Sequence, residues 1–398
     1  GGETVAEYRP QGSHEGRDAT VIRNICPEEG SGKVWMATDQ GLVGFDEQKG
    51  RWCQYRHTPA LPWSLSDDTV MSVLIDRSGV LWVGTWNGGV NRADVRQGSF
   101  HTEFSVPGDP SSLLHDNIRD IAAEPDGTLW VGSGMGLDRR RPGEEGWRHY
   151  TPQPGNTESL SYAFVTDLYR DTRGTLWVGT QKGLNRYLPQ RDAFRVYRGR
   201  LQGGVLSSGF IQRLMDHPGD PDKLLVGTRD AGLNVLDKRT GENRVFVHDR
   251  ERADSLGGYG VYALASHPRS GIWIGTFDRG LELWDGTHDH FEHFRHDPSD
   301  PHSLGSDRVT FIQMDSRKTQ ECIWVGTWGG GLNRLNLRSG RFQRFNLDSG
   351  FPTNMVSAVL EDGHGNWWVS TPQGVIWLDT RSMETRMYDV LVGDLSNA

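Results

Sequence analysis

The chain has 398 residues, of which 51 are glycine and 15 are tryptophan, and only 35% belong to the hydrophobic set. This mixture favours many short strands joined by turns. The net charge of −9 and the lack of a basic run argue against a nucleic-acid partner. No apolar run of about 18 residues is present, so we expect no membrane contact by this chain.

A short apolar segment that ends in a small residue followed by Ser or Thr recurs eight times. It reads VWMAT in the first copy, LWVGT in the second and IWVGT in the seventh. Its second position holds Trp35, Trp82, Trp130, Trp177, Leu225, Trp273, Trp324 and Trp368, at spacings of 44 to 51 residues. A regular period over the whole chain indicates a repeat architecture. The repeats lie near residues 17–57, 64–104, 111–151, 159–198, 205–248, 255–296, 303–347 and 351–390.

Each repeat predicts four strands, which we call a, b, c and d in chain order. In the second repeat, strand a is SLSDDTVMSVLID, strand b is VLWVGT, strand c is GVNRAD and strand d is SFHTEF. A turn of the type Asp76–Gly79 precedes strand b, and a glycine such as Gly89 follows it, because tight hairpins favour positive φ. Four short antiparallel strands per repeat predict a propeller blade.

We therefore predict an all-β fold with a single β-propeller domain over residues 1–398, built of eight four-stranded antiparallel blades. The alternative is seven blades plus an extra unit. The Trp of each strand b is expected to be buried between neighbouring blades.

The two ends of the chain bear on how such blades would close into a ring. Residues 4–9 (TVAEYR) resemble a strand d although they precede the first strand a, and residues 383–390 already supply a strand d for the eighth repeat. The N-terminal segment either pairs with the C-terminal blade or remains from a preceding blade of a longer protein. We favour pairing, because it protects a sheet edge.

The three cysteines, Cys26, Cys53 and Cys322, lack CxxC spacing, so they predict neither a zinc site nor a disulfide framework. Cys26 falls in strand a and Cys53 in strand d of the first repeat, roughly 14 Å apart at ~4.8 Å per strand. A disulfide requires Cα atoms within about 7 Å. We expect three free thiols.

Catalytic motifs are missing from the sequence. It contains neither GxSxG nor HExxH, so hydrolase and zinc-protease functions lack their usual residues. The histidines at 288, 290, 293 and 296 are interpreted as a solvated strand d face. We expect no catalytic residues, no metal and no cofactor. The alternative is a carbohydrate-active propeller enzyme, either a lyase or a glycoside hydrolase.

Candidate binding residues lie where the b–c hairpins and the starts of strand a meet on one face. Aromatic and charged side chains there are not required by the turns, and they suit a small molecule such as an oligosaccharide, or a partner peptide or domain. The alternative is that they cap neighbouring loops. The hairpin candidates are Trp86, Asn87, Arg229, Phe277, Asp278, Arg279 and Trp328, and those at the start of strand a are Arg119, Arg213 and Arg308.

The units LWVGTxxGLNRY and IWVGTWGGGLNRL, the links HDPSDPHSLGSDRV and GDPSSLLHDNI, and the ending SGFPTNMVSAVLEDGHGNWWVSTPQGV resemble two-component regulator propeller repeats. The resemblance covers nearly all of residues 17–390, with Leu225 as a departure. It implies a ring that usually has seven blades. It also implies a non-catalytic ligand-sensing region, in the periplasm, of a hybrid histidine kinase or a diguanylate cyclase. A second propeller or a linker domain would then be a partner in the full-length receptor.

Overall fold

The computed structural model describes residues 6–8, 22–28, 31–46, 51–58, 64–76, 79–94, 99–268, 271–314, 322–349, 351, 353–356, 358–361, 366–371, 374–379, 382 and 384–388. Regular structure in these ranges is β-strand apart from two short 3-10 helices. None of the helices there is long and apolar enough to cross a membrane. The all-β expectation is confirmed.

The described strands form eight sheets, and apart from β1 (Ala6–Tyr8) the strands of each sheet lie inside one predicted repeat. Seven sheets have four strands in the order a-b-c-d, as propeller blades do, and one has five. The chain clusters into two compact units, Gly1–His149 with Gly350–Ala398 (unit 1) and Tyr150–Ser349 (unit 2). The single domain and the number of blades in a closed ring stay predictions.

Unit 1 contains four sheets, of which only the last residue of β13 belongs to unit 2. Their strands are β2 (Ile22–Glu28), β3 (Lys33–Thr38), β4 (Gly41–Asp46), β5 (Arg51–Tyr55); β6 (Val70–Ile75), β7 (Val80–Thr85), β8 (Val90–Asp94), β9 (Ser99–Glu103); β10 (Ile118–Ala123), β11 (Leu129–Ser133), β12 (Leu137–Arg140), β13 (Arg148–Tyr150); and β30 (Ala358–Glu361), β31 (Asn366–Thr371), β32 (Gly374–Asp379), β33 (Thr385–Tyr388), with β1 (Ala6–Tyr8).

Unit 2 contains the other four sheets and both 3-10 helices, η1 (Arg200–Gln202) and η2 (Leu347–Ser349). Its strands are β14 (Val165–Arg170), β15 (Leu176–Thr180), β16 (Gly183–Leu188), β17 (Ala193–Tyr197); β18 (Ile211–Asp216), β19 (Lys223–Thr228), β20 (Leu233–Asp237), β21 (Asn243–Phe246); β22 (Val261–His267), β23 (Gly271–Thr276), β24 (Leu281–Trp284), β25 (Phe291–Phe294); and β26 (Val309–Met314), β27 (Cys322–Thr327), β28 (Leu332–Asn336), β29 (Arg341–Phe345).

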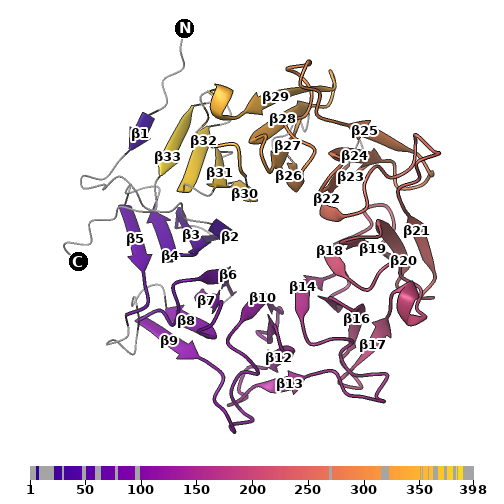
Figure 1. Ribbon diagram of the computed structural model, residues 1–398. Helices are drawn as coiled ribbons and strands as arrows, with labels where there is room; N and C mark the ends of the chain where they lie inside the picture. Colours follow the sequence, from indigo (N-terminus) through magenta and orange to yellow (C-terminus); the bar gives the residue numbers. More distant parts are fainter. Residues whose placement is uncertain are drawn as a thin grey trace. The chain divides into compact units, whose positions relative to one another are not determined.

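Neighbouring sheets within a unit pack strand a against strand a. In unit 1, β2 lies against β6 on one side and β30 on the other, so the first and last repeats are neighbours (Figure 1). Trp368 of the last repeat packs with Ile22 and Met36 of the first. The short strand β1 pairs in parallel with β33, with Ala6 opposite Arg386. Pairing of the N-terminal segment with the C-terminal sheet is confirmed, and β33 keeps the fourth position.

The strand b tryptophans are all buried, as predicted. Those of the first, second, fourth, sixth and eighth repeats pack on a neighbouring sheet of their own unit. Trp82 packs on Ile118 and Leu129 of the following sheet. The sheets approach closely because strand b carries a glycine there: a Cβ at Gly84 would lie 2.7 Å from Ile118 Cγ2. Leu225 takes the tryptophan's place in the fifth repeat and is itself fully buried.

The remaining consensus residues also serve the fold, as the fourth repeat shows. Trp177 Nε1–H donates to Asp171 in the a–b turn (2.9 Å). The Arg186 guanidinium lies over the Trp177 ring, 5.7 Å from its centroid. Asn185 accepts a hydrogen bond from the amide of Ser161 in the d–a link (2.8 Å). These consensus residues therefore hold the a–b turn, the strands and the d–a link of their own repeat.

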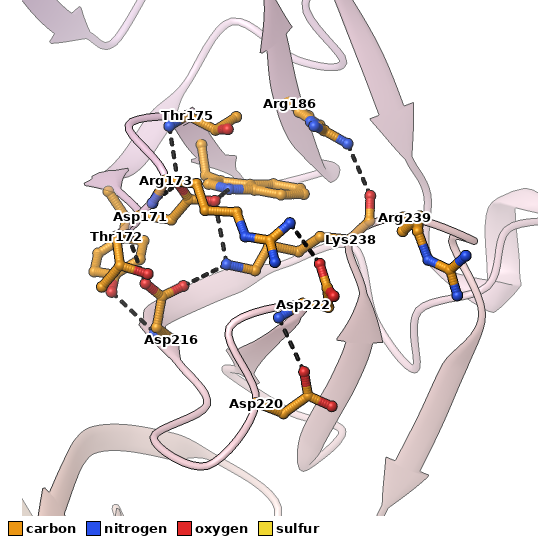
Figure 2. A network of polar contacts seen from close by, with 12 residues as sticks. Asp171, Thr172, Arg173, Thr175, Arg186, Asp216, Asp220, Asp222, Lys238 and Arg239 are labelled. Carbon is orange, nitrogen blue, oxygen red and sulfur yellow. Dashed lines mark hydrogen bonds and ion pairs between the residues drawn. The ribbon is translucent and has the colours of Figure 1, made fainter.

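A buried lysine connects two neighbouring sheets of unit 2 (Figure 2). Lys238 directly follows β20, and its side chain is only 5% exposed. Its Nζ donates to Asp216 Oδ1 (2.7 Å) and to Asp171 Oδ2 (3.2 Å). Its carbonyl accepts a hydrogen bond from Arg186 Nη1 (2.8 Å). Two carboxylates, Asp171 of the fourth repeat and Asp216 of the fifth, thus share one ammonium group. The three side chains connect the two repeats.

All three cysteines are free, as predicted. Across the first sheet, Cys26 is paired with Trp35, Trp35 with Gly44, and Gly44 with Cys53. Two strands therefore separate the two thiol-bearing residues.

Candidate functional site

The start of strand a and the b–c hairpin meet at the same end of each sheet. In three repeats of unit 2 a backbone hydrogen bond joins them: Arg229 N–H donates to Phe210 O (3.0 Å), Phe277 N–H to Gly260 O (3.2 Å) and Trp328 N–H to Arg308 O (2.8 Å). The bond holds the backbone of the first hairpin residue in place, while the side chain of that residue is exposed.

Strand a carries a β-bulge near its start in seven repeats. The ladder skips one residue there, for example Tyr262 between Val261 and Ala263. Bulges re-aim a side chain, and they are common beside functional sites. The bulged residues are Arg23, Met71, Arg119, Thr166, Gln212, Tyr262 and Thr310.

Two aromatic rings and an arginine form the best-defined cluster in unit 2. The Phe277 ring, whose residue is 39% exposed, stacks on Tyr262 at 4.8 Å between centroids and 27° between planes. The Arg308 guanidinium, from the next repeat, lies 5.9 Å from the Phe277 centroid. We call Tyr262, Phe277 and Arg308 the Phe277 platform.

Arg213 reaches the edge of this platform from the fifth repeat. Its Nε–H donates to Tyr262 O (3.4 Å), and its Nη1 lies 3.6 Å from Asp167 Oδ1. Burial raises the pKa of Asp167, while Arg213 and a backbone amide oppose that rise. Arg229 lies over the Phe210 ring at 4.8 Å.

Three further predicted residues of unit 2 are exposed on the hairpins. Trp328 is 51% exposed, and its carbonyl accepts a hydrogen bond from the Ser306 hydroxyl (3.0 Å). Asp278 and Arg279 follow Phe277 and are also exposed. Trp328, Asp278 and Arg279 lie on the b–c hairpins of the sixth and seventh repeats. We call the exposed b–c hairpins of unit 2, together with the Phe277 platform, the hairpin face of unit 2.

A separate cluster lies in unit 1. The Arg119 guanidinium is 5.4 Å from the Trp86 centroid, and Trp86 and Asn87 are exposed. Burial and the neighbouring charge of Arg23 lower the pKa of Arg119. Two of the three predicted strand a arginines thus lie over a hairpin aromatic ring, Arg119 in unit 1 and Arg308 in unit 2.

Sequence reasoning missed Tyr262, whose ring stacks on Phe277, and Phe210, whose ring lies beneath the Arg229 guanidinium. Both stand at the start of strand a, and the bulge that turns Tyr262 leaves no mark in the sequence. For Tyr262 the available signal was an aromatic residue at a position where other repeats carry Arg, Met, Thr or Gln.

The histidine cluster needs a correction. His288 and His290 are exposed as expected, but His293 is only 24% exposed and contacts the fully buried Glu282. Its position opposite Glu282 in the ladder explains the difference. No group of three metal-ligating side chains occurs in the part of the chain that the structure describes.

Sheets of this order and these residue roles define a β-propeller repeat protein. The chain matches the two component regulator propeller family over residues 64–87 and 159–182. It is also 27% identical to histidine kinase P4 of Formosa agariphila, over a stretch that covers 44% of this chain and 16% of the kinase.

Two solved structures share the fold. One is the extracellular domain of a putative hybrid two component system from B. thetaiotaomicron, 19% identical with a TM-score of 0.50, covering 93% of this chain and 48% of that chain. The other is the computationally designed Ika8 protein, 14% identical with a TM-score of 0.59, covering 94% of this chain and 98% of that one. The chain thus spans about half of the bacterial domain.

Proposed function

We propose that the chain is the non-catalytic sensor part of a bacterial signal-transduction receptor, that it works in the periplasm, and that the hairpin face of unit 2 binds an oligosaccharide. The repeat family, the kinase relative and the extracellular domain of similar fold support a sensor role. A second propeller or a linker domain of the full-length receptor would receive the signal.

The observation that carries the ligand proposal is the Phe277 platform. The fold explains the consensus residues, yet it does not require an exposed phenylalanine stacked on a bulged tyrosine. Sugar rings pack on aromatic faces, and guanidinium groups such as those of Arg308 and Arg213 donate hydrogen bonds to hydroxyl or carboxylate oxygens. This combination fits a saccharide better than a purely apolar ligand.

The carbohydrate-active enzyme remains the alternative because Asp167, with its raised pKa, lies beside Arg213 near the platform. Glycoside hydrolysis needs a second carboxyl group about 5 to 10 Å away, across the scissile bond. Turnover of any oligosaccharide by the purified chain, lost in Asp167→Asn, would favour the enzyme.

A thermal-shift screen of neutral and acidic oligosaccharides tests the sensor proposal. A ligand that binds only the folded state stabilises it by about 2.7 kcal/mol at 100 times its Kd. We expect Phe277→Ala to abolish the shift and Phe104→Ala, an aromatic residue of unit 1 that is 51% exposed, to keep it. A shift unchanged in Phe277→Ala but lost in Trp86→Ala would move the site to the unit 1 cluster.

A further inference from the structure

In several repeats, the second residue after the hairpin glycine that precedes or opens strand c contacts the d–a link of its own repeat. In four repeats it is an asparagine whose side-chain oxygen accepts a link amide. The bonds are Ser66 N to Asn91 (3.0 Å), Ser161 N to Asn185 (2.8 Å), Ser207 N to Asn234 (2.8 Å) and Gly305 N to Asn333 (2.8 Å). These neutral contacts do not respond to pH.

Two repeats replace this asparagine with a buried acid, Asp138 in the third and Glu282 in the sixth, and both side chains are 0% exposed. Each acid is bonded by a histidine of strand d, His149 at 2.6 Å from Asp138 and His293 on Glu282. The acid and the histidine thus occur together in two repeats.

Both ring nitrogens of His293 face hydrogen-bond acceptors. Nδ1 contacts Glu282 Oε2, and Nε2 lies 2.7 Å from the carbonyl oxygen of Ala253 in the d–a link. An ionised carboxylate and a carbonyl only accept, so with Glu282 ionised both contacts are hydrogen bonds only when both ring nitrogens carry protons, that is, when the ring is an imidazolium. The hydrogen bond to Glu282 raises the pKa of His293. His149 likewise bonds Asp138 and the carbonyl of Pro110, and its pKa is raised.

The link that His293 holds leads directly to the Phe277 platform. A Cβ at Gly257 would overlap both Glu282 and Arg295, so the link lies tight against the acid. A Cβ at Gly258 would lie 2.8 Å from Asp278 Oδ1 in the hairpin. Further along, Gly260 O accepts the amide of Phe277 (3.2 Å).

We propose that protonated His293 fastens link 253–260 to Glu282, and that loss of this proton to solvent releases the link and loosens the Phe277 platform. This regulation rests on the proposed function, because it acts on the same site. When the ring is neutral, the remaining proton stays on Nδ1 beside the carboxylate, and Nε2 then turns a lone pair toward Ala253 O. The contact with the link becomes repulsive.

The other charged groups around His293 either keep their charge or lie on exposed side chains, where ion pairs contribute little. Arg295 Nη1 donates to Glu282 Oε1 (2.6 Å) and stays charged at all relevant pH values. In the link, Arg252 and Asp254 pair with each other (3.3 Å), and His290 lies 3.8 Å from Asp254, all on exposed side chains. His248 Nδ1 faces only Leu256 O (3.1 Å), which a neutral ring satisfies.

The sign of the effect follows from the raised pKa. A histidine whose folded pKa exceeds the unfolded value near 6.5 holds the link fully below about pH 6.5. The contact weakens as pH rises through the folded pKa of His293. Binding at the platform should therefore be favoured on the acidic side.

Hydrogen–deuterium exchange of the purified chain between pH 6 and pH 9, corrected for intrinsic exchange, tests this without any ligand. We expect the protection factors of amides in 255–260 and of Phe277 to fall with rising pH, by up to about tenfold per unit, the slope of one proton. The asparagine-held link at 153–161 contains no histidine and should show no such fall.

Two variants isolate the histidine. His293→Arg copies the seventh repeat, where Arg344 bonds the link carbonyls of Asp300 (2.7 Å) and Ser303 (2.8 Å), so protection should persist at high pH. His293→Gln should expose the link at pH 6 already. Protection that is independent of pH in the unaltered chain, or that falls equally in His293→Arg, would overturn the proposal and leave the oligosaccharide proposal intact.

Discussion

Replacing Lys238 with Met is expected to lower the free energy of unfolding by about 3 to 5 kcal/mol, because it leaves two carboxylates without their shared cation in a buried site. Asp171 and Asp216 are 1% and 11% exposed, and both bond Lys238 Nζ (Figure 2). Urea denaturation at pH 7 followed by tryptophan fluorescence measures the change.

The matched control is Lys223→Met. Lys223 is 43% exposed and pairs with Asp220 at 3.1 Å, so its loss should cost less than about 1 kcal/mol. Equal losses in the two variants would show that the Lys238 network has no special role.

The same network predicts a dependence on acid. Burial alone would raise the pKa of Asp171, but hydrogen bonds from Trp177, Thr175 and Lys238 outweigh it and lower that pKa. The stability that Asp171 contributes is present above the unfolded value near 3.9, and it is lost as pH falls through the lower folded pKa. The destabilisation caused by Lys238→Met should therefore shrink in strong acid.

The second large effect is expected for Trp273→Ala, which should cost about 3 to 5 kcal/mol. Trp273 is 1% exposed and packs on Val309 and Ile323 of the next sheet. Trp273→Leu should cost less, because the fifth repeat already works with Leu225 in this position. Trp328→Ala, which removes a ring that is 51% exposed, is the control, and a loss as large as that of Trp273→Ala would contradict the packing described above.

The period and the turns were enough to predict the sheets, because the consensus residues act within their own repeat or on the next one. Trp177 binds the acid six positions earlier, and Asn185 binds the link before its own strand a. Residues with such roles recur at the same positions in successive repeats, so they can be identified from the sequence alone.

The candidate site was only partly predictable, because some of its contacts join residues that do not recur at fixed spacings. Phe277 and Arg308 were identified as non-consensus residues, but Tyr262 joins them through a bulge whose register change does not appear in the sequence. His293 was misread as solvated, because its burial depends on Glu282 opposite to it on β24. Such contacts depend on side-chain placement across strands.

The most direct test of the sensor proposal is hydrogen–deuterium exchange with and without the oligosaccharide that gives the largest thermal shift. We predict added protection at residues 229–231, 260–262 and 277–279, which form the hairpin face around the Phe277 platform, and none at residues 189–192 of a c–d turn. Protection confined to the c–d turns, or spread evenly over the chain, would contradict a ligand site on the hairpin face.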